Sequence, residues 1–84
     1  MNKINETALE NVTGGKLRRI DNPDVGYANI RSTPGFESRV MFRMKHGELV
    51  DTTGLVVHRD GYDWYEFYLN DNVMGWVAGS LIGY

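Results

Sequence analysis

The stretch that decides the fold is DWYEFYLNDNVMGWV, residues 63–77. Its first half alternates, which predicts a β-strand with Tyr65, Phe67 and Leu69 on one face. The opposite face carries Glu66 with an aromatic residue on either side. Because a carboxylate prefers water to an apolar interior, we expect that second face to be exposed to solvent.

Working outward, Asn and Asp tolerate positive φ, so residues 70–72 predict a hairpin turn. Further turn signals follow one another at intervals of eight to thirteen residues, a spacing typical of small antiparallel barrels and sandwiches. Gly54 interrupts an alternating run and predicts a bulge that bends its strand. The strands we expect lie near residues 16–20, 26–31, 39–44, 48–58, 63–69 and 73–77.

Composition limits the classes of protein that fit. Eighty-four residues allow one domain at most, and 42% hydrophobic residues are enough for a modest core. A net charge of −2 leaves no surplus of positive charge for phosphates, so we expect no nucleic-acid partner. The longest uncharged run, residues 72–84, is shorter than the roughly 20 residues that a membrane-spanning helix needs, and none is expected.

No catalytic constellation is visible. The chain has no cysteine, which excludes disulfides, thiolate catalysis and cysteine zinc sites. Its two histidines, His46 and His58, stand beside glycine turns and favour exposed polar roles over general-base roles. We therefore expect no enzyme activity, no cofactor and no metal site.

The first fifteen residues, MNKINETALENVTGG, have a different character. Four apolar side chains form a stripe at helical spacing, and acidic and amide side chains face away. Such a short helix is marginal in water unless a partner covers the stripe. Two glycines end it and leave an extended backbone without Cβ atoms. The four apolar residues are Met1, Ile4, Leu9 and Val12.

This segment resembles the double-glycine leader of bacterial peptides that are exported by ABC transporters carrying a cysteine-peptidase domain. With the second glycine as place one, the apolar residues occupy places four, seven, twelve and fifteen, which match the leader pattern. The resemblance implies recognition by such an exporter and cleavage at Gly14-Gly15, before Lys16. It divides the chain into a leader, 1–15, and a body, 16–84. An incidental Gly-Gly in a disordered terminus is the simpler alternative.

The rest of the chain, about residues 26–84, resembles a bacterial SH3 domain. The matching pieces, in order, are Asn29-Ile30-Arg31, a Ser/Pro/Gly loop at 32–35, strand 40–44, Lys45-His46-Gly47, Trp64 to Phe67, a polar hairpin at 70–72, and Gly75-Trp76-Val77. The resemblance implies a small SH3-like antiparallel barrel. GLVVHRDGYD at 54–63 is longer than the family's usual connection.

The matching residues also have expected structural roles. We expect Arg31 to bind carbonyls of a neighbouring loop through its guanidinium donors. Gly75 should let the backbone approach an aromatic ring, and Val77 should point inward while Trp76 stands half exposed.

Recognition is the function that remains. Aromatic rings at the surface or rim of a barrel suit an extended peptide or a sugar, since they cover a large area at little cost in rotamer entropy. The resemblance likewise implies a secreted, cell-wall-associated module that binds a wall peptide or glycan. A bacteriocin-like or signalling polypeptide is the alternative, and each aromatic residue could instead be part of the core. The expected ligand-binding residues are Tyr27, Trp64, Tyr68, Trp76 and Tyr84.

Overall fold

The computed structural model describes residues 15–70 and 72–84, of which 58% are strand and 4% helix. The expected all-β class is therefore confirmed, and every strand boundary lies within one residue of its expected position. The expected leader positions Met1, Ile4, Leu9, Val12 and Gly14 lie outside the described residues. The elements are β1 (Leu17–Arg19), β2 (Tyr27–Arg31), β3 (Val40–Lys45), β4 (Leu49–Arg59), β5 (Tyr62–Asn70), β6 (Val73–Ala78) and the 3-10 turn η1 (Gly79–Leu81).

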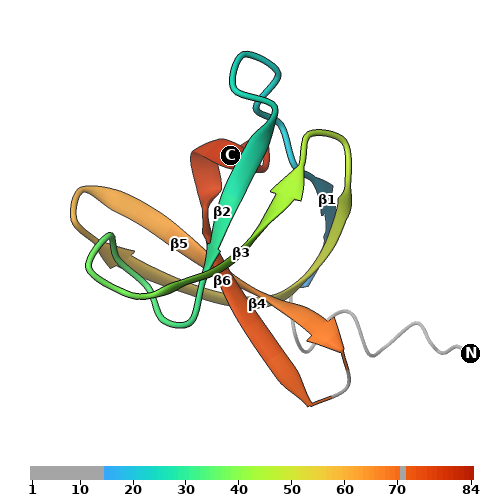
Figure 1. The fold of residues 1–84 in the computed structure, drawn as a ribbon. Coiled ribbons are helices and arrows are strands. Elements are labelled where there is room, and N and C mark those ends of the chain that lie inside the picture. Colours follow the sequence, from blue (N-terminus) through green and yellow to red (C-terminus); the bar gives the residue numbers. More distant parts are fainter. Residues whose placement is uncertain (1–14, 71) are drawn as a thin grey trace, which may run out of the picture.

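The six strands form one antiparallel sheet in the order β1-β4-β5-β6-β2-β3, and this sheet curls into a half-barrel (Figure 1). Neighbouring strands β4, β5 and β6 pair along most of their length. By contrast, β2 and β6 share a single registered pair, Arg31 with Trp76. Strands β1 and β3 are the two edges of the sheet. Within the described residues, no helix is long and apolar enough to cross a membrane.

Two features give β4 and β5 their shape. The register between them shifts between Thr52 and Val56, and Gly54 within that shift has a φ of 98°. The expected bulge is thus confirmed, and it bends β4 where the sheet curls. The 54–63 segment continues β4, reverses at Asp60-Gly61 and begins β5. Both turn residues have positive φ, 56° and 81°, as a two-residue hairpin requires.

The main core lies inside the curl of the sheet. Gly75 belongs to the wall of this core: a Cβ built on it would lie 2.8 Å from Ile30 Cγ2 and 3.3 Å from Phe67 Cζ. Only a glycine permits this close approach of β6 to the Phe67 ring, which confirms its expected role. Val77 is fully buried, also as expected. The core comprises Ile20, Ala28, Ile30, Val50, Phe67, Val77 and Ile82.

A second, smaller cluster lies on the other face of β5 and β6 and consists of Trp64, Trp76 and Ala78. The register, with Trp64 opposite Ala78 and Glu66 opposite Trp76, confirms that Trp64 and Glu66 share a face. The expected exposure of that face is wrong at Trp64, which is 2% exposed. It is wrong at Trp76 too, which is 8% exposed and not half exposed. The curled sheet and the 32–39 loop cover a face that alternation alone marks as open.

Candidate functional site

The loop between β2 and β3, residues 32–39, is held in place from two sides. Arg31 Nη1 donates hydrogen bonds to the carbonyl oxygens of Phe36 and Ser38, both at 3.0 Å. The expected role of Arg31 is therefore confirmed. From the other side, the Phe36 amide donates to Asp60 Oδ2 at 2.9 Å, so the tip of the β4–β5 hairpin also fixes the loop.

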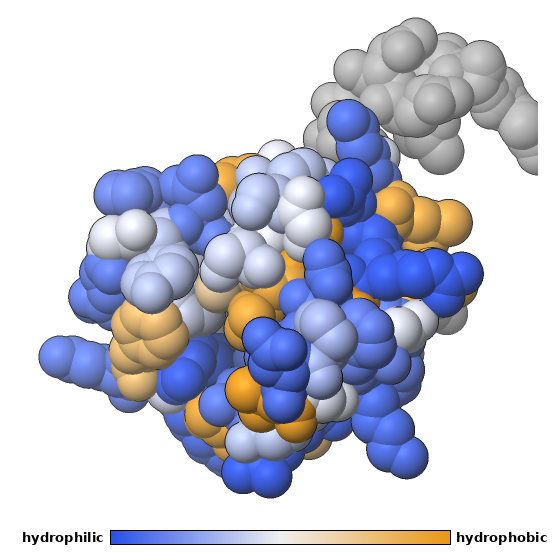
Figure 2. Space-filling model, turned by 90° about the horizontal axis from the view of Figure 1, so that it is seen from above, coloured by the Kyte–Doolittle hydropathy of each residue, from blue (hydrophilic) through white to orange (hydrophobic). Residues whose placement is uncertain are grey.

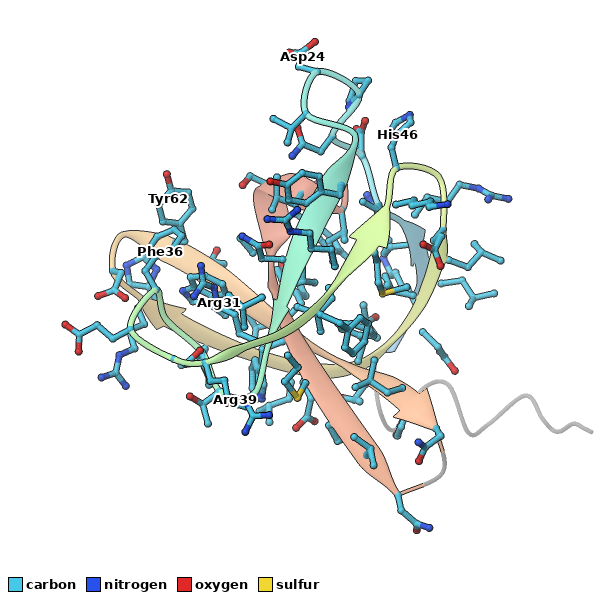
Figure 3. All side chains as sticks on the ribbon, in the orientation of Figure 1. Asp24, Arg31, Phe36, Arg39, His46 and Tyr62 are labelled. Carbon is cyan, nitrogen blue, oxygen red and sulfur yellow. The ribbon has the colours of Figure 1, made fainter. Side chains whose placement is uncertain are left out.

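This double attachment places Phe36 over an aromatic group. The Phe36 ring meets Trp64 edge-on, with centroids 5.0 Å apart, and Tyr62 edge-on at 5.1 Å. Figure 3 shows Phe36 and Tyr62 next to each other, with Arg31 beside them. Phe36 and Tyr62 are 49% and 44% exposed, whereas Trp64 is buried and donates its Nε1 proton to the Arg59 carbonyl at 2.8 Å. Trp64 thus supports two rings that solvent can reach.

A cleft of about 170 Å³ lies beside this aromatic group. Its floor includes alternate residues of β2, and the 22–25 loop and η1 close its other side. Known small-molecule pockets enclose roughly 300–1,000 Å³, so this cleft is sized for one side chain or ring of a longer ligand. The residues that line it are Asn22, Val25, Tyr27, Ala28, Asn29, Arg31, Phe36, Trp64, Ala78 and Leu81.

The structure brings together two of the five residues expected to bind a ligand. Tyr27 and Trp64 line the cleft. Tyr68 is 42% exposed but lies at a separate hollow with Asp51, and Trp76 packs within the second cluster. Tyr68 lies four residues beyond Trp64 on β5, which is about 13 Å along the strand. Trp76 packs against Trp64 and Ala78, which line the cleft, but does not line it itself.

Tyr84 is engaged elsewhere in the fold. Its ring stacks on Tyr65, with centroids 4.3 Å apart and planes 3° from parallel, and the Arg18 guanidinium lies 4.2 Å from the same ring. Tyr84 is therefore already stacked. Burial raises the pKa of Tyr65 above 10.0; Tyr84 and then Asp63 add to the increase, and Arg18 opposes it.

A larger hollow, of about 430 Å³, lies between β1 and the end of the chain. Three of its polar side chains already have partners in the fold. Arg18 donates to the carbonyls of Ile82 and Gly83, Arg19 donates to Gly47, and His46 Nδ1 accepts the Asn22 amide proton. These bonds hold β1 and the neighbouring turns together. The polar side chains of the hollow are therefore largely used within the fold, and few are left to bind a ligand.

The titratable side chains are spread over the part of the chain that the structure describes. Residues 15–70 and 72–84 contain no group of three or more His, Cys, Asp or Glu that could hold a metal ion. The one histidine–carboxylate pair there is His58 Nδ1 with Asp63 Oδ1, 2.9 Å apart, and these side chains are 71% and 60% exposed. Solvent screens such a pair, which fits a surface contact across the β4–β5 hairpin.

Comparison of the chain with family models, with curated proteins and with solved structures finds no significant match. The resemblances to a double-glycine leader and to a bacterial SH3 domain therefore rest on the residues quoted above.

Sequence reasoning missed Phe36 and Asn29 as cleft residues, and Tyr62 as a member of the aromatic group beside the cleft. Phe36 carried a usable signal: a large aromatic side chain directly after Pro34-Gly35, in a loop where polar residues are usual. Tyr62 carried none, because it lies in the 54–63 segment whose path the sequence left open. Asn29 belongs to the quoted Asn-Ile-Arg piece, and its alternation with the buried Ile30 could have placed it on the outer face.

Proposed function

We propose that residues 16–84 form a secreted, non-enzymatic SH3-like binding module that recognises an extended cell-wall peptide or glycan through the aromatic cleft. In this proposal residues 1–15 are the leader, and a peptidase-bearing ABC exporter removes them after Gly15. The all-strand body and the order of its turns agree with the SH3 resemblance. The agreement includes the Arg31 contact with the loop that follows it.

The observation that carries the proposal is the position of Phe36. Phe36 covers Trp64 with one edge, yet its ring stays 49% exposed. Two hydrogen bonds fix its backbone: Arg31 donates to its carbonyl, and its amide donates to Asp60. A fixed, exposed ring next to a cleft loses little entropy when a ligand packs on it. Figure 2 shows that apolar side chains on the face seen from above form small patches among hydrophilic ones. A ligand with both apolar and polar groups fits such a surface.

The test is retention on purified peptidoglycan. Residues 16–84 should sediment with it, and Phe36→Ala or Tyr62→Ala should weaken retention by about fivefold or more, the effect of losing one well-packed aromatic contact. Both rings are exposed, so the fold should survive. Trp64→Ala is a poorer probe, because its loss empties the second cluster.

Tyr68→Ala is the matched control, since Tyr68 is similarly exposed but lies away from the cleft. Equal losses in the control and in the cleft variants would refute the assignment of the site. A wild-type protein that stays in the supernatant at low and high salt would refute wall binding itself, and would favour the bacteriocin-like or signalling alternative.

A further inference from the structure

The outer face of β2 continues into β3. Tyr27, Asn29 and Arg31 alternate with buried residues on β2, and the register pairs Asn29 with Arg43 and Tyr27 with Lys45. Directly opposed residues of an antiparallel pair point to the same side of the sheet, so Arg43 and Lys45 extend this face. The Arg43 guanidinium lies 4.2 Å from the centre of the Tyr27 ring.

The cationic groups of this face are not neutralised within the described part of the chain. There, His58 with Asp63 is the one ion pair within 4.0 Å, so neither Arg43 nor Lys45 has a carboxylate partner. Glu48 contacts this part of the chain through the backbone: its Oε2 accepts the backbone amide proton of Lys45 at 2.6 Å. The face therefore carries positive charge on a chain whose net charge is negative.

The same face also offers a polar group that can bind the backbone of a peptide ligand. The Asn29 side-chain amide has no hydrogen-bond partner among residues 15–70 and 72–84, and it lies between Tyr27 and Arg31 on β2. Five strand residues extend about 13 Å, which matches about five residues of an extended peptide. Along that length the face offers, in order, a cation on an aromatic ring, an amide, and the Phe36 group.

We propose that this cleft binds an extended peptide that carries a carboxylate, with the carboxylate at Arg43, the peptide backbone at Asn29 and an apolar group against Phe36. This inference rests on the proposed function and names the chemistry of its ligand. A neutral glycan would pack on the rings but would leave Arg43 and Lys45 unpaired. Guanidinium groups bind carboxylates through two parallel hydrogen bonds, and an aromatic ring beneath holds the guanidinium plane in place.

The experiment compares three forms of purified peptidoglycan. The first is native, the second has its peptide carboxylates converted to amides by carbodiimide and ammonia, and the third has its peptides removed enzymatically. Residues 16–84 should bind the native form, and should bind the amidated form up to about fivefold more weakly, which is the upper limit for an exposed charge pair. Binding to the third form, from which the peptides have been removed, should be lost.

The outcomes separate the two levels of the proposal. Equal affinity for native and amidated material overturns the carboxylate, and full retention on peptide-free strands overturns the peptide in favour of glycan. Failure to bind any of the three overturns the proposed function itself.

Variants of the protein test the same contact from the other side. Arg43→Gln keeps much of the side-chain length and removes the charge, so it should weaken binding to native but not to amidated material. Arg39→Gln is the matched control: Arg39 is also exposed and next to β3, and Figure 3 shows it away from Phe36 and Tyr62. If the two variants lose affinity equally, Arg43 has no specific role.

A second inference concerns the Gly15–Lys16 bond and is independent of the cleft. The Lys16 amide donates to Thr52 Oγ1 at 2.8 Å, and the Lys16 carbonyl accepts both the Thr52 amide proton at 2.9 Å and its hydroxyl proton at 2.7 Å. Thr52 is only 3% exposed. A Cβ on Gly15 would overlap the Thr52 carbonyl oxygen, so Gly15 is also packed against β4.

A peptidase must hold its substrate as an extended strand and reach the carbonyl carbon and the nitrogen of the bond that it hydrolyses. In the folded body that nitrogen belongs to Lys16 and its proton is bound to Thr52. We infer that folding protects the Gly15–Lys16 bond, so hydrolysis, which leaves a carboxylate on Gly15 and an amine on Lys16, takes place on the unfolded chain or after β1 detaches. This inference rests on the proposed leader.

The test uses the purified peptidase domain of an exporter that cleaves double-glycine leaders. A peptide of residues 1–20 should be cut, and the folded chain should be cut about tenfold or more slowly, as expected where local opening limits access. Thr52→Val, which keeps the side-chain size but removes the hydroxyl, should recover much of the rate. Thr53→Val, whose hydroxyl bonds to Glu66 instead, is the control.

Tryptophan fluorescence shows whether each variant is folded, and wild type in increasing urea provides the same test without a substitution, because cleavage should then accelerate. An uncut peptide refutes the leader. A cut peptide together with an equally fast folded chain, or a Thr52→Val rate equal to wild type, refutes the protection by Thr52.

Discussion

Replacing Arg31 by methionine tests how the cleft is built. The substitution keeps an apolar stem and removes every donor, so it deletes the hydrogen bonds to the carbonyls of Phe36 and Ser38. A net hydrogen bond contributes about 0.5–1.5 kcal/mol. The guanidinium also lies 5.3 Å from the Phe36 ring and 5.9 Å from Trp64, and such exposed cation–π contacts contribute about 0.5–1 kcal/mol each. Because solvent weakens the Phe36 contacts, we expect a total loss of about 2 kcal/mol.

For a domain of this size, about 2 kcal/mol corresponds to a decrease of roughly 8–16 °C in Tm. Circular dichroism during heating measures that change. Release of the loop would also admit water to Trp64, which is 2% exposed, so its fluorescence emission should shift to longer wavelength before the protein unfolds. Retention on peptidoglycan should decrease as well, because Phe36 would no longer be fixed.

Arg39→Met is the control for a general effect of removing one surface charge. If Arg31→Met keeps the Tm of that control and the emission wavelength of wild type, then Arg31 does not hold the loop. The attachment of the 32–39 loop would then not depend on the Arg31 hydrogen bonds.

Three further changes probe the body of the fold. Gly75→Ala should lower the free energy of unfolding by about 1–3 kcal/mol, because the new Cβ would lie 2.8 Å from Ile30 Cγ2. Gly47→Ala meets no atom within 4 Å and should lower it by about 1 kcal/mol, through the φ of +94° alone. Urea denaturation compares the two variants. Phe67→Ala removes the largest apolar side chain of the main core, and a loss of about 3–5 kcal/mol should leave little folded protein by circular dichroism. Burial raises the pKa of Tyr65, so the unfolded chain loses that proton at a lower pH than the folded protein, and stability should decline as the pH rises above 10.0. Tyr65→Phe should make this decline smaller, as measured by urea titrations at pH 8 and pH 11. Equal losses of stability in Gly75→Ala and Gly47→Ala would contradict the close approach at Gly75. A stable Phe67→Ala protein would contradict the role of Phe67 in the core, and identical alkaline behaviour of Tyr65→Phe and wild type would contradict the raised pKa of Tyr65.

Some local features followed from residue type alone. Gly54 predicted the bulge because a glycine inside an alternating run breaks the pairing, and the register shift lies there. Arg31 binds carbonyls only five and seven residues further along the chain, and its expected role is confirmed. Lys16 shows the limit of this reasoning, because its partner, Thr52, is 36 residues away in the chain.

The two tryptophans show why the cleft itself was less predictable. Alternation places Trp64 and Glu66 on one face, and Glu66 suggests that this face is wet. The structure covers the Trp64 end with Phe36 and leaves Glu66 half buried, bonded to Thr53 Oγ1 at 2.9 Å. A carboxylate can thus share a face with a buried indole when a loop covers only part of the strand.

The sequence alone determined the strands, the turns and the bulge, because alternation, positive-φ residues and glycine act over a few neighbouring residues. Only the tertiary structure decided which rings reach solvent and which residues meet at the cleft. The reason is geometric: Phe36, Asp60 and Trp64 come from different loops and strands, and their contact depends on the curl of the whole sheet and not on their spacing along the chain.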